Sequence, residues 1–243
     1  MPSATELNAG QVSPWFRFWS RPPGIHVGER HLQARYRVTM DNLLSTFPDI
    51  RGKRVLDYGC GEALDARRLA AAGAEALLYD RSEYFRNRVQ SRYARDAGIR
   101  VLDEPSFAAL PGGSVDLMLV CSVIQYLDAR ELDLLIDLGK HLLKPGGVLI
   151  LADILPKSLD TLSDVIDFMS YSARHGFFLS GLRTLIDMAT SNYRAQFRDS
   201  QLAHYDLGEL SALLRRHGLE PTAIPTNIGI SRARRTLLAR KPA

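Results

Sequence analysis

An acidic residue and two glycines between Asp57 and Gly61 form the segment of this sequence that most directly suggests ligand binding. Glycine at positions 59 and 61 lets the backbone turn sharply and lets a ligand lie directly against it. A nicotinamide dinucleotide fingerprint would need a third glycine where Leu64 stands, and it would place a pyrophosphate beside acidic side chains that repel it. Asp57 and Glu62, on the two sides of the turn, favour a cationic ligand instead.

This segment resembles the first motif, D-x-G-x-G, of the Rossmann-like methyltransferases that use S-adenosylmethionine. The sulfonium and free ammonium of that cofactor suit the acidic surroundings of the turn. The resemblance implies that the loop holds the methionine part of the cofactor and that Asp80, at the end of the second strand, binds both ribose hydroxyls. A carboxylate can accept both hydroxyl protons. The expected cofactor contacts in these two segments are Asp57, Gly59, Cys60, Gly61, Asp80 and Arg81.

Three later segments resemble the same family in the same order along the chain. Residues 110–116 are similar to the entry of the family's fourth strand, and residues 120–127 are similar to its exit, where the activated methyl faces the acceptor. Residues 143–147 are similar to the turn before the fifth strand. The resemblance therefore covers roughly residues 50–240, and it implies that Cys121 and Ser122 also lie against the cofactor.

One position departs from the family pattern. The family usually has an acidic residue that bonds the adenine amino group where this chain has Ser106, followed by Phe107. Ser106 can accept a hydrogen bond from the amino group, and Phe107 can pack on the adenine ring. The alternative is that Asp103 or Glu104 takes this role through a longer loop. We expect Ser106 and Phe107 to bind adenine.

Strand and helix patterns alternate from Lys53 to Leu155, which predicts a parallel sheet covered on both faces. Asp128 followed by Glu131 predicts a capping box at a helix start. With the resemblance, these patterns predict an α/β fold: a doubly wound, mainly parallel seven-stranded sheet whose last strand is antiparallel, plus a helical cap. The expected strands are 54–56, 76–79, 99–102, 115–121, 148–152, 222–230 and 236–239, and the expected helices are 64–72, 83–97, 128–142 and 206–218.

The two flanks of this region are expected to close the site. Residues 1–48 are interpreted as an N-terminal lid segment and helix, and residues 49–243 as the Rossmann-like domain. Apolar residues at helical spacing make 157–204 a helical insertion that caps the acceptor. The aromatic segment Trp15–Trp19 is interpreted as lid packing, with a membrane-surface helix as the alternative. The expected acceptor contacts are Tyr36, Tyr126, His175 and Phe178, with Tyr126 and His175 also as catalytic candidates.

Composition supports a globular protein and excludes several other classes. The 243 residues are 46% hydrophobic with a formal charge of +4, which fits one large domain or one domain with a cap. Two cysteines exclude a disulfide framework and a four-thiolate zinc site, and we expect no metal. The basic residues are spread along the chain, unlike a nucleic-acid footprint. Without a signal peptide pattern or a membrane-length apolar run, a cytoplasmic protein is expected.

The sequence thus predicts methyl transfer from S-adenosylmethionine to an oxygen or nitrogen of a small molecule or metabolite, which leaves S-adenosylhomocysteine. The Pro-Pro-Tyr motif of amino-directed DNA methyltransferases is absent after residue 121, so DNA is not expected as a partner. An RNA-modifying methyltransferase and a cofactor-binding protein without catalytic activity are the alternatives. The identity of the acceptor and the oligomeric state do not follow from the residues.

Overall fold

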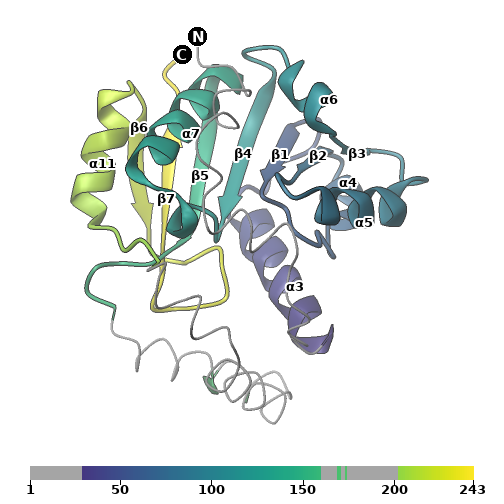
Figure 1. The fold of residues 1–243 in the computed structure, drawn as a ribbon, viewed down its shortest axis with the longest axis horizontal. Helices are drawn as coiled ribbons and strands as arrows, with labels where there is room; N and C mark the ends of the chain where they lie inside the picture. The colour runs from purple at the N-terminus through teal and green to yellow at the C-terminus, as the bar shows by residue number, and fades with distance from the viewer. Residues whose placement is uncertain (1–28, 160–168, 171–172, 174–201) are drawn as a thin grey trace.

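A seven-stranded sheet in the order β3-β2-β1-β4-β5-β7-β6 forms the centre of the computed structural model (Figure 1). The structure describes residues 29–159, 169–170, 173 and 202–243. The strands from β3 to β5 are paired in parallel, whereas β7 runs antiparallel to both β5 and β6. The predicted doubly wound sheet is therefore confirmed. Its strands are β1 Arg54–Tyr58, β2 Glu75–Tyr79, β3 Ile99–Val101, β4 Val115–Cys121, β5 Leu143–Ile154, β6 Glu220–Ile224 and β7 Arg235–Arg240.

The helices lie close to their predicted positions, and the predicted capping box is present. The Asp128 carboxylate accepts from the Glu131 N–H at 2.7 Å, and the Glu131 carboxylate accepts from the Asp128 N–H at 3.1 Å. In the part of the chain that the structure describes, two short α-helices and one 3-10 helix lie among the longer helices. The helices are α3 Glu29–Thr46, α4 Arg67–Ala71, α5 Glu83–Tyr93, α6 Glu104–Ala108, η1 Ile124–Tyr126, α7 Ala129–Leu142 and α11 Leu207–Arg216.

The structure corrects several predicted boundaries. The helix expected over 64–72 begins only at Arg67, because tight turns continue through the bond from Ala66 N–H to the Ala63 carbonyl. The helix expected over 83–97 ends at Tyr93. α6 was not expected, although Asp103 is its N-cap and a proline lies in its first turn. The strand expected over 222–230 is shorter, and β5 extends beyond 148–152 at both ends.

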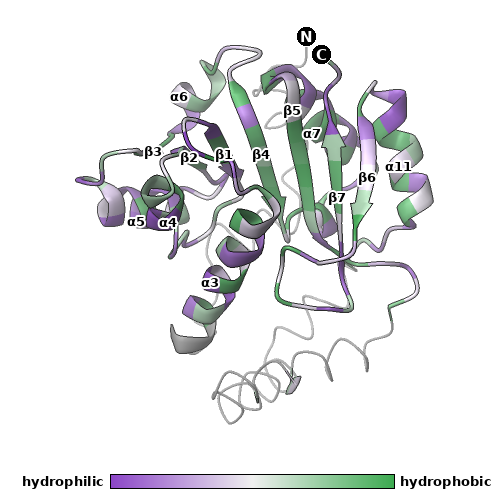
Figure 2. Ribbon diagram, turned by 180° about the vertical axis from the view of Figure 1, so that it is seen from behind, coloured by the Kyte–Doolittle hydropathy of each residue, from purple (hydrophilic) through white to green (hydrophobic). Residues whose placement is uncertain are grey.

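Side chains of the central strands alternate between two apolar layers, one on each face of the sheet. Leu56 and Met118 belong to the layer that α7 and α11 cover. Val55 and Leu119 belong to the layer that α3 and α4 cover. Figure 2 shows β4 and β5 as apolar along most of their length. Burial on both faces explains why these strands are almost continuous apolar runs in the sequence.

Helix α3 begins beyond the carboxyl ends of the strands and runs back into the domain core (Figure 1). Its residues Met40 and Leu43 are buried, with 3% and 0% exposure. The predicted lid over 1–48 lies outside the described residues up to position 28, including Trp15–Trp19, and so does most of the insertion over 157–204. Within the described part of the chain, none of the helices combines the length and apolarity that crossing a membrane requires.

We predict that Leu43→Ala destabilises the whole domain, because Leu43 is fully buried between α3 and the sheet. Removing this side chain leaves a cavity, and the free energy of unfolding should fall by about 2–5 kcal/mol. Urea denaturation followed by circular dichroism measures the effect. Gln33→Ala on the exposed side of α3 is the control and should change stability by less than about 0.5 kcal/mol. Equal stability of both variants would show that α3 is not part of the core.

Candidate functional site

Four polar side chains meet at the edge where the parallel strands end. Asp57, Asp80, Ser122 and Asp153 lie at or just beyond the carboxyl ends of β1, β2, β4 and β5 respectively. Parallel pairing places these ends at one edge of the sheet, as the arrowheads of β4 and β5 show in Figure 1. In open α/β sheets ligands bind outside this edge. The fold therefore brings the predicted loop of residues 57–61 and the predicted exit of β4 together.

The turn after β1 requires glycine at two positions. Gly59 has φ +77° and Gly61 has φ +55°, in the region that side chains disfavour. A Cβ at Gly59 would stand 2.5 Å from Val123 Cγ2, and one at Gly61 would stand 2.7 Å from the Tyr36 hydroxyl. The turn is anchored to β2, where the Tyr79 carbonyl accepts from the N–H groups of residues 59 and 60 at 2.8 and 3.1 Å.

Asp57 is a buried carboxylate without a partner among the described residues. It is 8% exposed, and neither a hydrogen bond nor an ion pair to it is present in this part of the chain. Burial, and then repulsion by Asp80, raise the pKa of Asp57 to about 7. Burying a carboxylate without compensation is unfavourable. A ligand ammonium placed here would remove that penalty, so Asp57 fits the amino group of S-adenosylmethionine.

Asp80 is oriented by two backbone N–H groups. Its Oδ2 accepts from Gly61 at 2.9 Å and its Oδ1 accepts from Ser82 at 2.8 Å. Burial raises the pKa of Asp80 against the opposing effect of these bonds. Each carboxylate oxygen can accept a second hydrogen bond, so the group can still receive two hydroxyls. Arg81, the predicted neighbouring contact, lies 3.5 Å from the Glu131 carboxylate.

Glu62 does not contribute to a cationic ligand site, contrary to the sequence argument. Its carboxylate is paired with Arg88 at 2.7 Å and with Arg92 at 2.9 Å, both from α5. The two guanidinium groups neutralise the carboxylate and tie the turn to α5. The negative charge that a ligand would meet therefore comes from Asp57 and Asp80.

Tyr36 joins α3 to the glycine turn. Its hydroxyl accepts from the Glu62 N–H at 2.8 Å and donates to the Cys60 carbonyl at 3.2 Å. Its predicted contact with the acceptor stays a prediction. The contact with the turn was missed from the sequence because α3 and the turn are separated by the whole of β1.

The predicted adenine contacts lie in and around α6. Asp103 accepts from the Ser106 N–H at 2.9 Å and thereby caps α6. Phe107 is 3% exposed and stacks on Tyr79, with ring centroids 3.8 Å apart. Tyr79 also donates to the Glu104 carboxylate at 2.9 Å. The adenine roles of Ser106 and Phe107, and the alternatives at Asp103 and Glu104, stay predictions.

A buried polar network at the exit of β4 and β5 was not predicted. Asp153 is 4% exposed, and its Oδ2 accepts from Ser122 Oγ at 2.5 Å and from Arg234 at 2.7 Å. Asn227 donates to its Oδ1 at 3.1 Å. Arg35 of α3 donates to Ser122 Oγ at 2.9 Å. An acidic residue near the end of the predicted fifth strand was the one signal for this network in the sequence.

The remaining predicted residues, acceptor and catalytic candidates together with the predicted cofactor contact Cys121, divide into two groups. Tyr126 lies in η1 directly after β4, and burial raises its pKa. Burial, and then Asp153, raise the pKa of Cys121 to about 12, so its thiol stays protonated. His175 and Phe178 lie outside the described residues. Their roles, like that of Tyr126, stay predictions.

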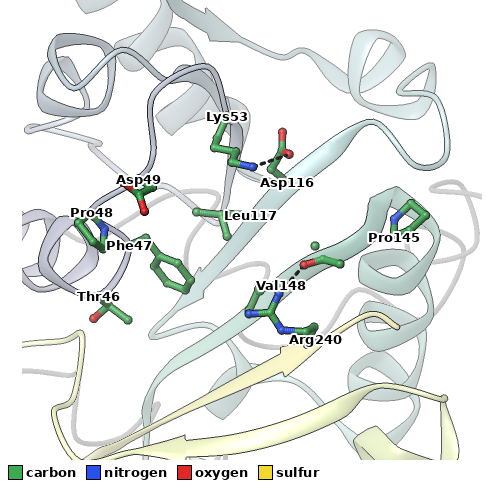
Figure 3. Close-up of a pocket in the computed structure, with 12 residues that line it drawn as sticks. Thr46, Phe47, Pro48, Asp49, Lys53, Asp116, Leu117, Pro145, Val148 and Arg240 are labelled. Atoms are coloured by element: carbon green, nitrogen blue, oxygen red, sulfur yellow. Dashed lines mark hydrogen bonds and ion pairs between the residues drawn. The ribbon is translucent and has the colours of Figure 1, made fainter. Parts of the chain in front are cut away.

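A cavity of about 500 Å³ lies away from these residues, at the opposite edge of the sheet (Figure 3). Phe47, Pro145 and Val148 supply apolar lining, and Arg240 donates to the Gly146 carbonyl at 2.8 Å. This edge holds the amino ends of β4 and β5. Ligands of doubly wound sheets bind at the other edge, so we place the functional site there.

Comparisons with known proteins identify the family of this chain. A family model for a methyltransferase domain matches residues 29–224. Malonyl-[acyl-carrier protein] O-methyltransferase of Enterobacter lignolyticus (strain SCF1) is 29% identical over 211 residues, covering 86% of this chain and 79% of that protein. Ubiquinone biosynthesis O-methyltransferase of Chelativorans sp. (strain BNC1) is 27% identical over 170 residues, covering 63% of this chain and 66% of that protein.

Solved structures show the same fold. Magnesium protoporphyrin IX methyltransferase from Synechocystis PCC 6803, with bound S-adenosylhomocysteine, matches with a TM-score of 0.54 at 19% identity. The match covers 94% of this chain and 93% of that one. The family match, the sheet order and the acidic glycine turn lead to one conclusion: the chain belongs to the class I methyltransferase domain family and is an enzyme that uses S-adenosylmethionine.

Proposed function

We propose that this enzyme transfers the methyl group of S-adenosylmethionine to an oxygen of a small-molecule acceptor. The observation that carries the proposal is the buried carboxylate of Asp57 beside the glycine turn, which has no partner among the residues that the structure describes. A neutral ligand would leave that carboxylate uncompensated, whereas an ammonium pairs with it. The matched relatives named above are O-methyltransferases, which supports oxygen over nitrogen as the acceptor atom.

We assign the cofactor roles along the carboxyl edge as follows. Asp57 holds the amino group, the backbone of residues 59–61 lies against the methionine chain, and Asp80 accepts both ribose hydroxyls. Support comes from the two N–H bonds that fix Asp80 and from Tyr36, which fixes the turn from the side of α3. Cys60, Arg81, Cys121 and Ser122 border these groups in the chain, and the contacts predicted for them remain part of the proposal.

The protein's contribution to the reaction is alignment. When bound, S-adenosylmethionine supplies an already activated methyl group. The residues of the chain have to hold donor and acceptor in line and exclude water, which can contribute several kcal/mol of the roughly 7–11 kcal/mol available from orientation. The exit of β4 at Ser122 and Tyr126 is where we place the acceptor.

We predict that cofactor affinity depends on the ionisation of Asp57. With a pKa of about 7, Asp57 is protonated at lower pH, and a neutral carboxyl does not attract an ammonium. The affinity for S-adenosylhomocysteine should therefore fall up to tenfold for each pH unit below 7 and level off above it. Calorimetry from pH 5.5 to 8 measures this. Asp57→Asn should bind weakly with a flat profile, and a pH-independent wild type would contradict the assignment.

The same variant should stabilise the protein without cofactor. The pKa of Asp57 is about 7 in the folded protein, above the usual value of 3.8. The free energy of unfolding of the wild type therefore falls as the pH rises from 3.8 to 7. Above pH 7 the loss is complete. Asp57→Asn removes the buried charge and should raise the free energy of unfolding there by about 2–4 kcal/mol. At pH 4 the difference should vanish.

We predict that Asp80→Asn weakens binding of S-adenosylhomocysteine by roughly 10- to 100-fold, because charged hydrogen bonds to two hydroxyls are lost. The amide keeps the size of the side chain, so the fold should persist. The matched control is Asp49→Asn, an exposed aspartate at the opposite edge of the sheet. Calorimetry compares the two variants. Unchanged affinity in Asp80→Asn would move the ribose contact to another residue.

A further inference from the structure

The polar network at the exit of β4 and β5 holds the carboxylate of Asp153 among several donors. Arg234 and Ser122 both donate to Asp153 Oδ2, and Asn227 donates to Oδ1. The buried carboxylate of Asp153 is thereby paired and hydrogen-bonded on both oxygens. It is not available as the counter-ion of a further group.

Arg35 reaches the same network from α3 without a direct ion pair. Its Nη2 donates to Ser122 Oγ at 2.9 Å, and Ser122 stands between this guanidinium and Asp153. Among the described residues, no carboxylate forms an ion pair with Arg35. The side chain is exposed, and a guanidinium has five N–H donors, most of which this one bond leaves for a ligand.

The charges at this exit favour an anionic acceptor. Arg234 pairs directly with Asp153, whereas the guanidinium of Arg35 forms no direct ion pair with a carboxylate among the described residues, so its positive charge can attract an anion. The rigid fork of a guanidinium matches a carboxylate, which it can bind through two parallel hydrogen bonds. Ser122 and Asp153 hold the fork in place.

From this geometry we infer that the acceptor carries a carboxylate, that Arg35 binds it, and that the methyl group goes to a carboxylate oxygen; the inference rests on the proposed function. The oxygen's lone pair forms the new O–C bond. The S–C bond breaks, and its electron pair stays on sulfur. The negative charge of the carboxylate and the positive charge of the sulfonium cancel, so a methyl ester and S-adenosylhomocysteine form without release of a proton.

The titratable groups around Arg35 support an acceptor that arrives ionised. Burial raises the pKa of Tyr126 and of Cys121, so both stay protonated near pH 7. Burial opposes ionisation of Asp153, but Arg234 and then Arg35 outweigh it and lower its pKa. These three groups are poor bases, whereas a hydroxyl acceptor would need a base to take its proton. A carboxylate needs no base.

The test compares wild type with Arg35→Gln and with Arg37→Gln, which removes the same charge from an exposed position on α3. Each full-length protein receives labelled S-adenosylmethionine and the small-molecule fraction of a cell extract. Mild alkali then releases methanol from methyl esters and leaves ethers and methylamines intact. We expect alkali-labile product from wild type and Arg37→Gln, and a kcat/KM roughly 10- to 100-fold lower for Arg35→Gln, mainly through KM.

A binding measurement separates recognition from turnover. In calorimetry on the S-adenosylhomocysteine complex at constant ionic strength, malonate should bind wild type and Arg37→Gln more tightly than Arg35→Gln. Its neutral diamide should show no such difference. All three proteins should bind S-adenosylhomocysteine equally, which shows that Arg35→Gln is folded. Arg35→Lys, which keeps the charge and loses the fork, should recover part of the activity.

Alkali-stable product overturns the inference, and so does a malonate affinity that does not depend on Arg35. If the alkali-stable product is an ether, or if only the malonate result fails, the proposed transfer to oxygen stands; an alkali-stable methylamine would overturn the oxygen acceptor as well. A wild-type protein that neither binds S-adenosylhomocysteine nor transfers methyl groups overturns the proposed function together with the inference.

Discussion

The site depends on the turn that follows β1, which is held in a conformation that glycine alone adopts easily. The Tyr79 carbonyl anchors it from β2, the Asp80 carboxylate binds the Gly61 N–H, and the Tyr36 hydroxyl holds it from α3. Three different elements thus fix one short segment. A fixed turn keeps the backbone open to a ligand, and it also sets the distance between Asp57 and Asp80, the two carboxylates on which cofactor binding is proposed to rest.

Charge divides the carboxyl edge of the sheet into two parts. Beside β1 and β2, Asp57 is buried without a partner in the described part of the chain, and Asp80 accepts from the N–H groups of Gly61 and Ser82. Beside β4 and β5, Asp153 accepts from Ser122 and Arg234, and Arg35 forms no direct ion pair among the described residues. The first part suits the cationic amino acid portion of S-adenosylmethionine. The second suits an anion, so donor and acceptor would meet where the two parts adjoin.

Strained backbone conformations at the carboxyl edge of the sheet cost stability, and the surrounding contacts must compensate for that cost. The non-glycine residues with positive φ in the described part of the chain are Ala63, Ser122 and Asp153, and all three follow or end strands here. Strained backbone of this kind persists only where surrounding contacts determine it. Those contacts include the bond from the Ser122 N–H to the Ala152 carbonyl and the bond from the Asp153 N–H to Asn227 Oδ1.

The sequence alone determined the parallel sheet covered on both faces, the glycine turn and the acidic strand ends, because parallel strands buried on both faces leave long apolar runs and tight turns need glycine. The predicted ends of the helices and of the strand after α11 were less accurate. Hydrogen bonds between distant residues, such as that from Asn227 to Asp153, decide where regular structure stops. The pairing of Glu62 with α5, the contact of Tyr36 with the turn, and the Arg35–Ser122–Asp153 network appeared only in the tertiary structure. Each joins residues far apart in the chain, and a spacing pattern carries no information about which side chains long-range packing brings together.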